Sequence, residues 1–231
     1  MNIVIIADDL TGASDTGIQA VVRGIPAAVR LQADGSARTD RECIAFDTDS
    51  RSDAPETARR KVAELCEKLL PLDPELVYKK IDSTLRGNIG AEIDAVFDAL
   101  KPDVAVIAPA YPDNGRKVRD GILYVDGVPL HLTDAARDPK TPVIHSHVPT
   151  WLGSQTKRKT GHVSAEVIRR GSKIAAERIR TLVADGCPYV SFDAECGDDL
   201  DAIVDAVHES GLRALWCGSA GLAGALFDRR G

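Results

Sequence analysis

The segment VYKKIDSTLRGN, at residues 77–88, concentrates polar groups where an apolar strand would run into a loop. Lys80 and Arg86 supply positive charge, Asp82 can accept hydrogen bonds from hydroxyl groups, and Ser83 can donate or accept one. This set suits a small ligand that carries both an acid group and several hydroxyls. The alternative is a charged loop held together by its own lysine–aspartate pair, and the residues alone leave both open.

The two adjacent lysines of this segment are not expected to do the same work. Successive side chains of a strand point to opposite faces, so only one of Lys79 and Lys80 should face a binding cleft. Gly87 permits a close backbone approach, and a helix that begins near Asn88 would favour an anion at its N-terminus.

A second polar segment, ADDLTGA at residues 7–13, places Asp8 and Asp9 side by side after an apolar run. Paired carboxylates can accept hydrogen bonds from substrate hydroxyls, hold a divalent cation or act as a base. Capping of the following helix would explain one of the two aspartates but not both.

The segment FDTDSR, at residues 46–51, ends in an arginine whose planar guanidinium suits bidentate binding of a carboxylate or a phosphate. Asp47 and Asp49 have the D-x-D spacing of haloacid dehalogenase-type phosphatases. Arg51 stands where that motif needs Thr or Val, which argues against such a phosphatase. The sequence also contains no P-loop, no G-x-G-x-x-G, no H-E-x-x-H and no G-x-S-x-G motif, and no metal site is predicted.

These polar segments follow short apolar runs that alternate with helical patterns, which predicts a doubly wound, mostly parallel α/β sheet with helices on both faces. Ligands of such sheets bind outside the carboxyl ends of the strands, so the polar loops should converge there. The loops at 109–116 and 217–221 should join them. The predicted strands are 2–7, 27–31, 43–47, 76–81, 104–108, 189–192 and 214–217, and the predicted helices are 12–23, 54–70, 89–100, 173–184, 200–209 and one from Ser219.

The alternating pattern is interrupted in the middle of the chain. ILYVDGVPL, at residues 122–130, predicts a hairpin that turns at Asp126-Gly127. Residues 131–159 are rich in Thr, Pro, Lys and His and predict a surface excursion with one short helix. The hairpin-containing excursion thus occupies the region around residues 120–160.

The composition fits one domain over residues 1–231. A formal net charge of −6 argues against a nucleic-acid partner, and no apolar run approaches the ~20 residues of a membrane span. Five cysteines, an odd number without C-x-x-C spacing, favour reduced thiols in a cytoplasmic protein. Whether the chain forms a homo-oligomer is left open.

Together these segments resemble one family, the N-terminal domain of the four-carbon acid sugar kinases, over essentially the whole chain. The resemblance rests on ADDLTGASDTG, DTDSR, YKKIDSTLRGNIGAE, APAYPDNGR, DGVPL, RDPKTPV and GSAGLAGAL, in that order. It implies phosphorylation of the terminal hydroxyl of threonate, erythronate or 3-oxo-tetronates by ATP and Mg²⁺. The N-terminal domain would hold the sugar acid, and a C-terminal domain would hold ATP. The substrate contacts implied by the motifs are Asp8, Asp9, Arg51, Lys80, Asp82, Ser83 and Arg86.

Two of these aspartates are candidates for the base that accepts the proton of the reacting hydroxyl. Lys80 and Arg86 should lower the pKa of Asp82 and make it a hydrogen-bond acceptor rather than a base. Asp9 has only the like charge of Asp8 beside it in the sequence, which favours Asp9 as the catalytic residue.

The sequence stops at Gly231, where the resemblance implies that an ATP-binding domain should follow. An excised domain, a natural short form and one chain of a split enzyme remain alternatives. A non-catalytic sugar-acid-binding module, acting alone or with a partner, is the alternative function.

Overall fold

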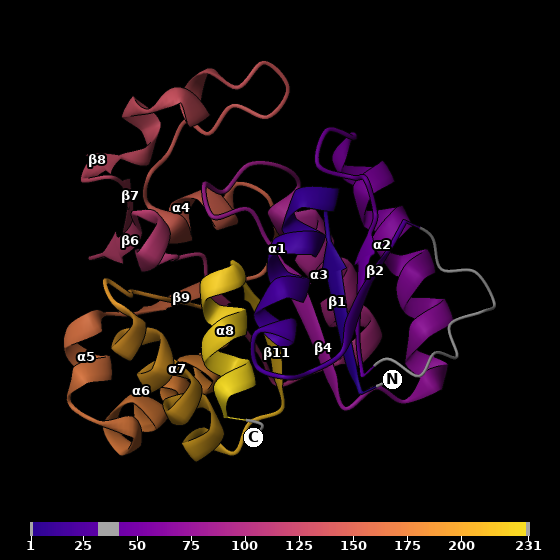
Figure 1. The fold of residues 1–231 in the computed structure, drawn as a ribbon. Coiled ribbons are helices and arrows are strands. Elements are labelled where there is room, and N and C mark those ends of the chain that lie inside the picture. Colours follow the sequence, from indigo (N-terminus) through magenta and orange to yellow (C-terminus); the bar gives the residue numbers. More distant parts are fainter. Residues whose placement is uncertain (1, 32–41, 230–231) are drawn as a thin grey trace.

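Eight parallel strands form the central sheet of the computed structural model, which describes residues 2–31 and 42–229 (Figure 1). Their order across the sheet is β2-β3-β1-β4-β11-β5-β10-β9. The bounds are β1 Ile3–Ala7, β2 Ala27–Arg30, β3 Cys43–Asp47, β4 Leu76–Lys80, β5 Val104–Ala108, β9 Thr160–Val163, β10 Tyr189–Phe192 and β11 Ala214–Gly218.

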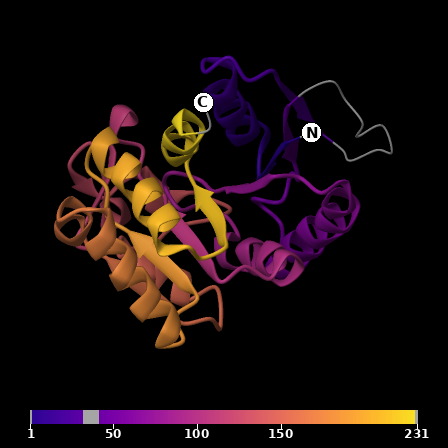
Figure 2. The same cartoon turned by 90° about the horizontal axis from the view of Figure 1, so that it is seen from below.

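Helices cover both faces of this sheet. In Figure 2 the indigo α1 and the yellow α8 lie on one side of the strands, and the purple α2 and magenta α3 lie on the other. The strands between them are buried: every residue of β1 and β5 is inaccessible, as expected for a parallel sheet covered twice. The helices are α1 Leu10–Val21, α2 Pro55–Leu69, α3 Ile89–Leu100, α4 Val148–Gly153, α5 Ala165–Arg169, α6 Ser172–Ala184, α7 Gly197–Ser210 and α8 Ala220–Asp228.

The predicted doubly wound fold is confirmed, and so is the hairpin. Asp126 and Gly127 both have positive φ, 50° and 82°, which is the backbone of a two-residue hairpin turn. The hairpin belongs to a small antiparallel sheet of β6 (Arg116–Arg119), β7 (Ile122–Val125) and β8 (Val128–Pro129).

Among the described strands and α-helices, β6, β9 and α5 were not predicted. In β6 only Val118 is buried between charged residues, and β9, TGHV, is a four-residue edge strand with a glycine. Neither segment has the continuous apolar run by which the buried strands are recognised. The excursion also holds 3₁₀ turns at Leu130–Leu132 and Asp134–Arg137 in addition to α4. The predicted strand 27–31 is confirmed as β2, which ends one residue earlier, at Arg30.

The strand order creates a crevice between β1 and β4. From β1 the chain passes through α1 to β2 on one side of the sheet, whereas from β4 it passes through α3 to β5 on the other. The loops that follow β1 and β4 therefore leave in opposite directions, and such a switch point is where open α/β sheets bind ligands. Among the described residues, no helix has the length and hydropathy to cross a membrane.

Candidate functional site

A cavity of about 370 Å³ lies at this switch point, at the carboxyl ends of the central strands. Its wall is mostly polar and comes from the loops after β1, β3, β4 and β5 together with the start of α8, as the sequence predicted for the converging loops. The lining residues are Asp9, Thr11, Gly12, Asp15, Arg51, Lys80, Asp82, Ser83, Arg86, Tyr111, Asn114 and Ala220.

Lys79 and Lys80 point to opposite faces of the sheet, as predicted. Lys80 faces the cavity, whereas the fully buried Lys79 turns towards α3 and places Nζ 2.8 Å from Glu92 Oε2. The alternation along β4 thus gives one lysine to the cavity and one to the interior of the domain.

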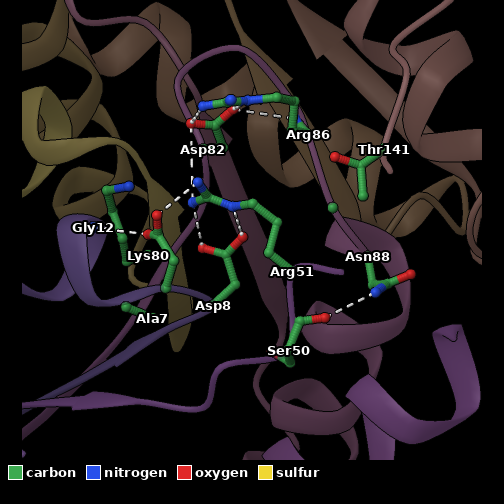
Figure 3. A network of polar contacts seen from close by, with 12 residues as sticks. Ala7, Asp8, Gly12, Ser50, Arg51, Lys80, Asp82, Arg86, Asn88 and Thr141 are labelled. Atoms are coloured by element: carbon green, nitrogen blue, oxygen red, sulfur yellow. Dashed lines mark hydrogen bonds and ion pairs between the residues drawn. The ribbon is translucent and has the colours of Figure 1, made fainter. Parts of the chain in front are cut away.

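Arg51 joins the loop after β3 to both aspartates after β1, and its contact with Asp8 can be followed in Figure 3. Its Nε and Nη2 donate to the two carboxylate oxygens of Asp8 at 2.6 and 3.0 Å, and Nη1 lies 2.7 Å from Asp9 Oδ2. Burial opposes the charge on Arg51, but the hydrogen bonds and charge of Asp8 outweigh it and raise the pKa of Arg51 above its ordinary value. Asp8 is the charged residue next to Asp9 in the sequence, but in the folded chain the guanidinium of Arg51 also contacts Asp9.

Asp82 is held in the same way by Arg86, from its own loop. Arg86 Nε donates to Asp82 Oδ2 at 2.7 Å, and Arg86 Nη2 donates to Oδ1 at 3.2 Å. Thr84 Oγ1 donates to Oδ2 as well. Burial would raise the pKa of Asp82, but the hydrogen bonds of Arg86 and the charges of Arg51 and Arg86 hold it well below its usual range. Asp82 is therefore an ionised hydrogen-bond acceptor, as predicted.

Two glycines let these side chains approach the backbone. A Cβ on Gly12 would lie 2.7 Å from Asp9 Oδ1 and 2.9 Å from Lys80 Nζ, so any side chain there would displace both charged groups. Gly87 has φ +89°, and a Cβ there would lie 3.1 Å from Arg51 Cγ and 3.2 Å from Asp8 Oδ2.

Lys80 differs from the other charged groups of the cavity. It is 5% exposed, yet its ammonium makes no hydrogen bond or ion pair with residues 2–31 or 42–229. Burial lowers the pKa of Lys80, and the nearby charges of Asp8 and Asp82 partly compensate. A buried cation that faces a cavity without a direct partner is ready to bind an anionic ligand.

Six of the seven predicted site residues line the cavity. The exception is Asp8, which lies behind Arg51 with a side chain 4% exposed. The sequence did not single out Thr11 and Asp15, whose positions on the first turns of α1 follow directly after the aspartate pair. It also missed Tyr111 and Asn114, although the loop that carries them was expected at the site.

The carboxylates of this cavity do not form a dedicated metal site. Asp8 and Asp9 are both occupied by Arg51, and Asp82 is occupied by Arg86. In the described parts of the chain, no group of three or more His, Cys, Asp or Glu side chains is placed to hold a metal ion. The residues present therefore do not fit a Mg²⁺ site of their own.

Replacing Arg51 with lysine is expected to lower the free energy of unfolding by about 1–3 kcal/mol. Lysine keeps the charge but cannot donate to both oxygens of the buried Asp8 while contacting Asp9. Urea denaturation measures the change, with Arg59→Lys as the control because Arg59 makes an exposed ion pair to Asp98. Equal unfolding free energies for the two variants would show that the fork of Arg51 does not hold this loop.

Comparison with known proteins places the chain in a family. Residues 3–226 match the family model described as the sugar-binding N-terminal domain. The chain is 43% identical to a D-erythronate kinase of Heliobacterium modesticaldum, with 93% of this chain and 50% of the relative covered. It is 40% identical to a D-threonate kinase of Bordetella bronchiseptica, with 96% and 54% covered.

A solved structure from Bordetella bronchiseptica has the same fold, with a TM-score of 0.84 and 38% identity over 98% of this chain and 55% of that one. It is described as a domain of unknown function, a domain-swapped dimer with bound citrate. The chain spans about half the length of the curated relatives that it matches. The match over residues 3–226 shows that this chain belongs to the family of sugar-binding N-terminal domains.

Proposed function

We propose that this chain binds a four-carbon sugar acid of the threonate, erythronate or 3-oxo-tetronate type and forms the substrate-binding half of an ATP-dependent kinase. The observation that carries the proposal is the unpartnered ammonium of Lys80 in a cavity that also presents the ionised Asp82. A sugar acid supplies the complementary groups, a carboxylate for the cation and hydroxyls for the acceptors. The names of the D-erythronate and D-threonate kinase relatives support the same ligand class.

The cavity suggests how the ligand is oriented. Lys80 holds the carboxylate, since the guanidinium of Arg51 is already bound by two aspartates. Asp82 and Ser83 bind hydroxyls of the carbon chain. Arg51 touches the ligand from the wall of the cavity while it fixes the aspartates. The citrate in the Bordetella structure, itself a hydroxy acid, is consistent with a ligand of this chemistry.

Asp9 is proposed as the base for the terminal hydroxyl. Its Oδ1 accepts from the backbone N–H of Gly12 at 2.8 Å and its Oδ2 faces Arg51, so the carboxylate is fixed at the wall of the cavity. As the hydroxyl oxygen attacks the γ-phosphorus, the hydroxyl proton passes to Asp9 and the bond to the ADP leaving group breaks. ATP, with its Mg²⁺, would be supplied by the other half of the kinase, in the same protein or in a separate chain.

A non-catalytic sugar-acid-binding module is the second candidate, because the residues proposed to bind the acid all lie in this chain. Its binding residues would be the same, and only phosphoryl transfer would differ. The odd set of five cysteines, without C-x-x-C spacing, supports a reducing, cytoplasmic setting for either function.

We expect the purified 231-residue chain to bind a sugar acid but to consume little or no ATP. A thermal-shift screen of four-carbon and five-carbon sugar acids, with and without ATP, identifies the ligand because a ligand of the folded state raises the melting temperature. A coupled assay for ADP tests turnover. Steady, tetronate-dependent ATP consumption by this chain alone would contradict the proposal that ATP binds to another domain or chain.

A further inference from the structure

Behind the cavity lies a buried polar cluster that reaches the cavity wall through backbone contacts, among them a 2.7 Å hydrogen bond from Lys79 Nζ to the carbonyl oxygen of Lys80. Lys79 of β4 and Glu92 of α3 are 0% and 1% exposed and form an ion pair with a 2.8 Å Nζ–Oε2 distance. The other oxygen, Glu92 Oε1, accepts a 2.7 Å hydrogen bond from Ser50 Oγ, and Ser50 is also fully buried. Thr48 Oγ1 lies 2.6 Å from Ser50 Oγ. Burying these charged and polar groups costs desolvation energy, which apolar side chains of the same volume would avoid.

The cluster holds Ser50 from three directions. Its side chain is bound by Glu92, its N–H donates to the carbonyl oxygen of Asp8 at 3.0 Å, and its carbonyl oxygen accepts from Asn88 Nδ2 at 3.1 Å (Figure 3). The preceding residue, Asp49, has φ +45°, a backbone conformation that needs surrounding contacts to persist. The contacts of Ser50 therefore fix the turn from which the next side chain, Arg51, is directed.

Arg51 is the residue that this arrangement places. Its own N–H donates to the Asp8 carbonyl at 3.2 Å, beside the N–H of Ser50, and its guanidinium then reaches both Asp8 and Asp9. A small rotation of the turn at Ser50 would move the guanidinium away from two carboxylates at once. The cluster thus connects the interior of the domain to the wall of the cavity at two points, through Ser50 to Arg51 and through Lys79 Nζ to the carbonyl oxygen of Lys80.

We propose that Lys79, Glu92 and Ser50 act as positioning residues, which hold Arg51 and through it Asp8 and Asp9 in the geometry that binds the sugar acid. The inference rests on the proposed function for its ligand, but its structural part concerns Arg51 alone. In this arrangement Glu92 Oε1 accepts the hydrogen bond of Ser50 while Glu92 Oε2 pairs with Lys79. Burial raises the pKa of Glu92, and the charge of Lys79 opposes that rise.

The sharpest test separates stability from binding. In the double variant Lys79→Met/Glu92→Leu the ion pair is replaced by apolar groups, a change that often leaves stability unaltered. We expect its melting temperature to stay within a few degrees of the parent. Its affinity for the tetronate that the parent binds, measured by calorimetry, should fall about tenfold or more because Ser50 loses its acceptor.

Ser50→Ala is the second variant, because it removes the hydroxyl that contacts Glu92 and Thr48 and keeps the Lys79–Glu92 ion pair and the hydrogen bond from Lys79 to Lys80. Ser210→Ala is its matched control, since Ser210 is also buried and donates a short hydrogen bond to Val207, within α7 and away from the cavity. We expect about tenfold weaker tetronate binding in Ser50→Ala and unchanged binding in Ser210→Ala.

A readout without ligand makes the test independent of the proposed function. The Nε–H proton of Arg51 is hydrogen-bonded to Asp8, and its exchange with water can be followed by ¹⁵N NMR. We expect this proton to exchange faster in Ser50→Ala and in the double variant than in the parent or in Ser210→Ala. If the parent binds no tetronate, the proposed function fails while the exchange of Arg51 still decides the positioning role. Arg51 exchange equal to that of the parent in both variants would overturn the inference, as would unchanged affinity in a parent that binds.

Discussion

The Lys80→Met variant is expected to bind the sugar acid about 100-fold more weakly than the parent, on the order of 2.7 kcal/mol. Methionine keeps much of the length and apolar stem of lysine but removes the ammonium that faces the cavity. The ligand carboxylate would then be buried beside Asp82 and Asp9 without the cation that makes its entry favourable. Calorimetric titration with the preferred tetronate measures the loss.

The same variant should not be less stable, and this distinguishes a binding residue from a structural one. Burial lowers the pKa of Lys80 in the folded chain below that of the unfolded chain. Between these two values the unfolded state binds more protons, so the contribution of Lys80 to stability is unfavourable at neutral pH and improves as the pH rises towards the ordinary lysine pKa. Lys80→Met should therefore unfold at an equal or higher temperature at pH 7, with the difference shrinking at alkaline pH.

Lys68→Met is the matched control for this experiment, because Lys68 is exposed in the last turn of α2. It should change neither affinity nor the pH dependence of stability. If Lys80→Met keeps the affinity of the parent, the ammonium of Lys80 does not bind the ligand. A large loss of stability would show instead that Lys80 supports the fold.

The second large effect is expected for Asp9→Asn in the complete kinase, which should lose turnover by about 100-fold or more while substrate affinity stays within about tenfold, roughly 1.4 kcal/mol. Asparagine is a good helix cap, so the hydrogen bond from Gly12 that begins α1 can be kept. The amide cannot accept the hydroxyl proton, and it loses the charge that pairs with Arg51. Single-turnover kinetics measures the chemical step apart from product release.

Asp82→Asn is the comparison variant for this prediction. Because the charges of Arg86 and Arg51 lower the pKa of Asp82, its carboxylate is a poor proton acceptor, and its replacement should mainly raise the substrate dissociation constant. Near-normal turnover in Asp9→Asn would show that Asp9 is not the base. The comparison is informative because each aspartate is paired with an arginine, Asp9 with Arg51 and Asp82 with Arg86.

Much of this site could be predicted from the sequence because the parallel sheet brings the polar loops to one edge. The apolar runs of β1, β3 and β4 identified the strands, and the ends of those runs identified six residues that line the cavity. The two-residue period of a strand predicted that only one of Lys79 and Lys80 would face the cavity, and the choice of Lys80 came from the family resemblance.

The pairing of charges could not be predicted, because it depends on contacts between loops that are far apart in the sequence. Arg51 and Asp8 are 43 positions apart, and Glu92 and Ser50 are 42 positions apart. The types and order of these residues in the sequence do not reveal that the guanidinium of Arg51 forms ion pairs with Asp8 and Asp9. The positive-φ conformations of Asp49 and Leu85, which shape the two loops, also leave no clear sequence signal, since neither residue is glycine.

The most direct test of the proposed function is calorimetric titration of this chain with D-erythronate and D-threonate in parallel with erythritol, which has the four-carbon polyol chain but no carboxylate. The cavity predicts binding of at least one tetronate at one site per chain, with erythritol about 100-fold weaker or undetectable because it cannot engage Lys80. Equal binding of erythritol and the tetronates, or no binding of either acid, would contradict the assignment of this cavity to a sugar acid.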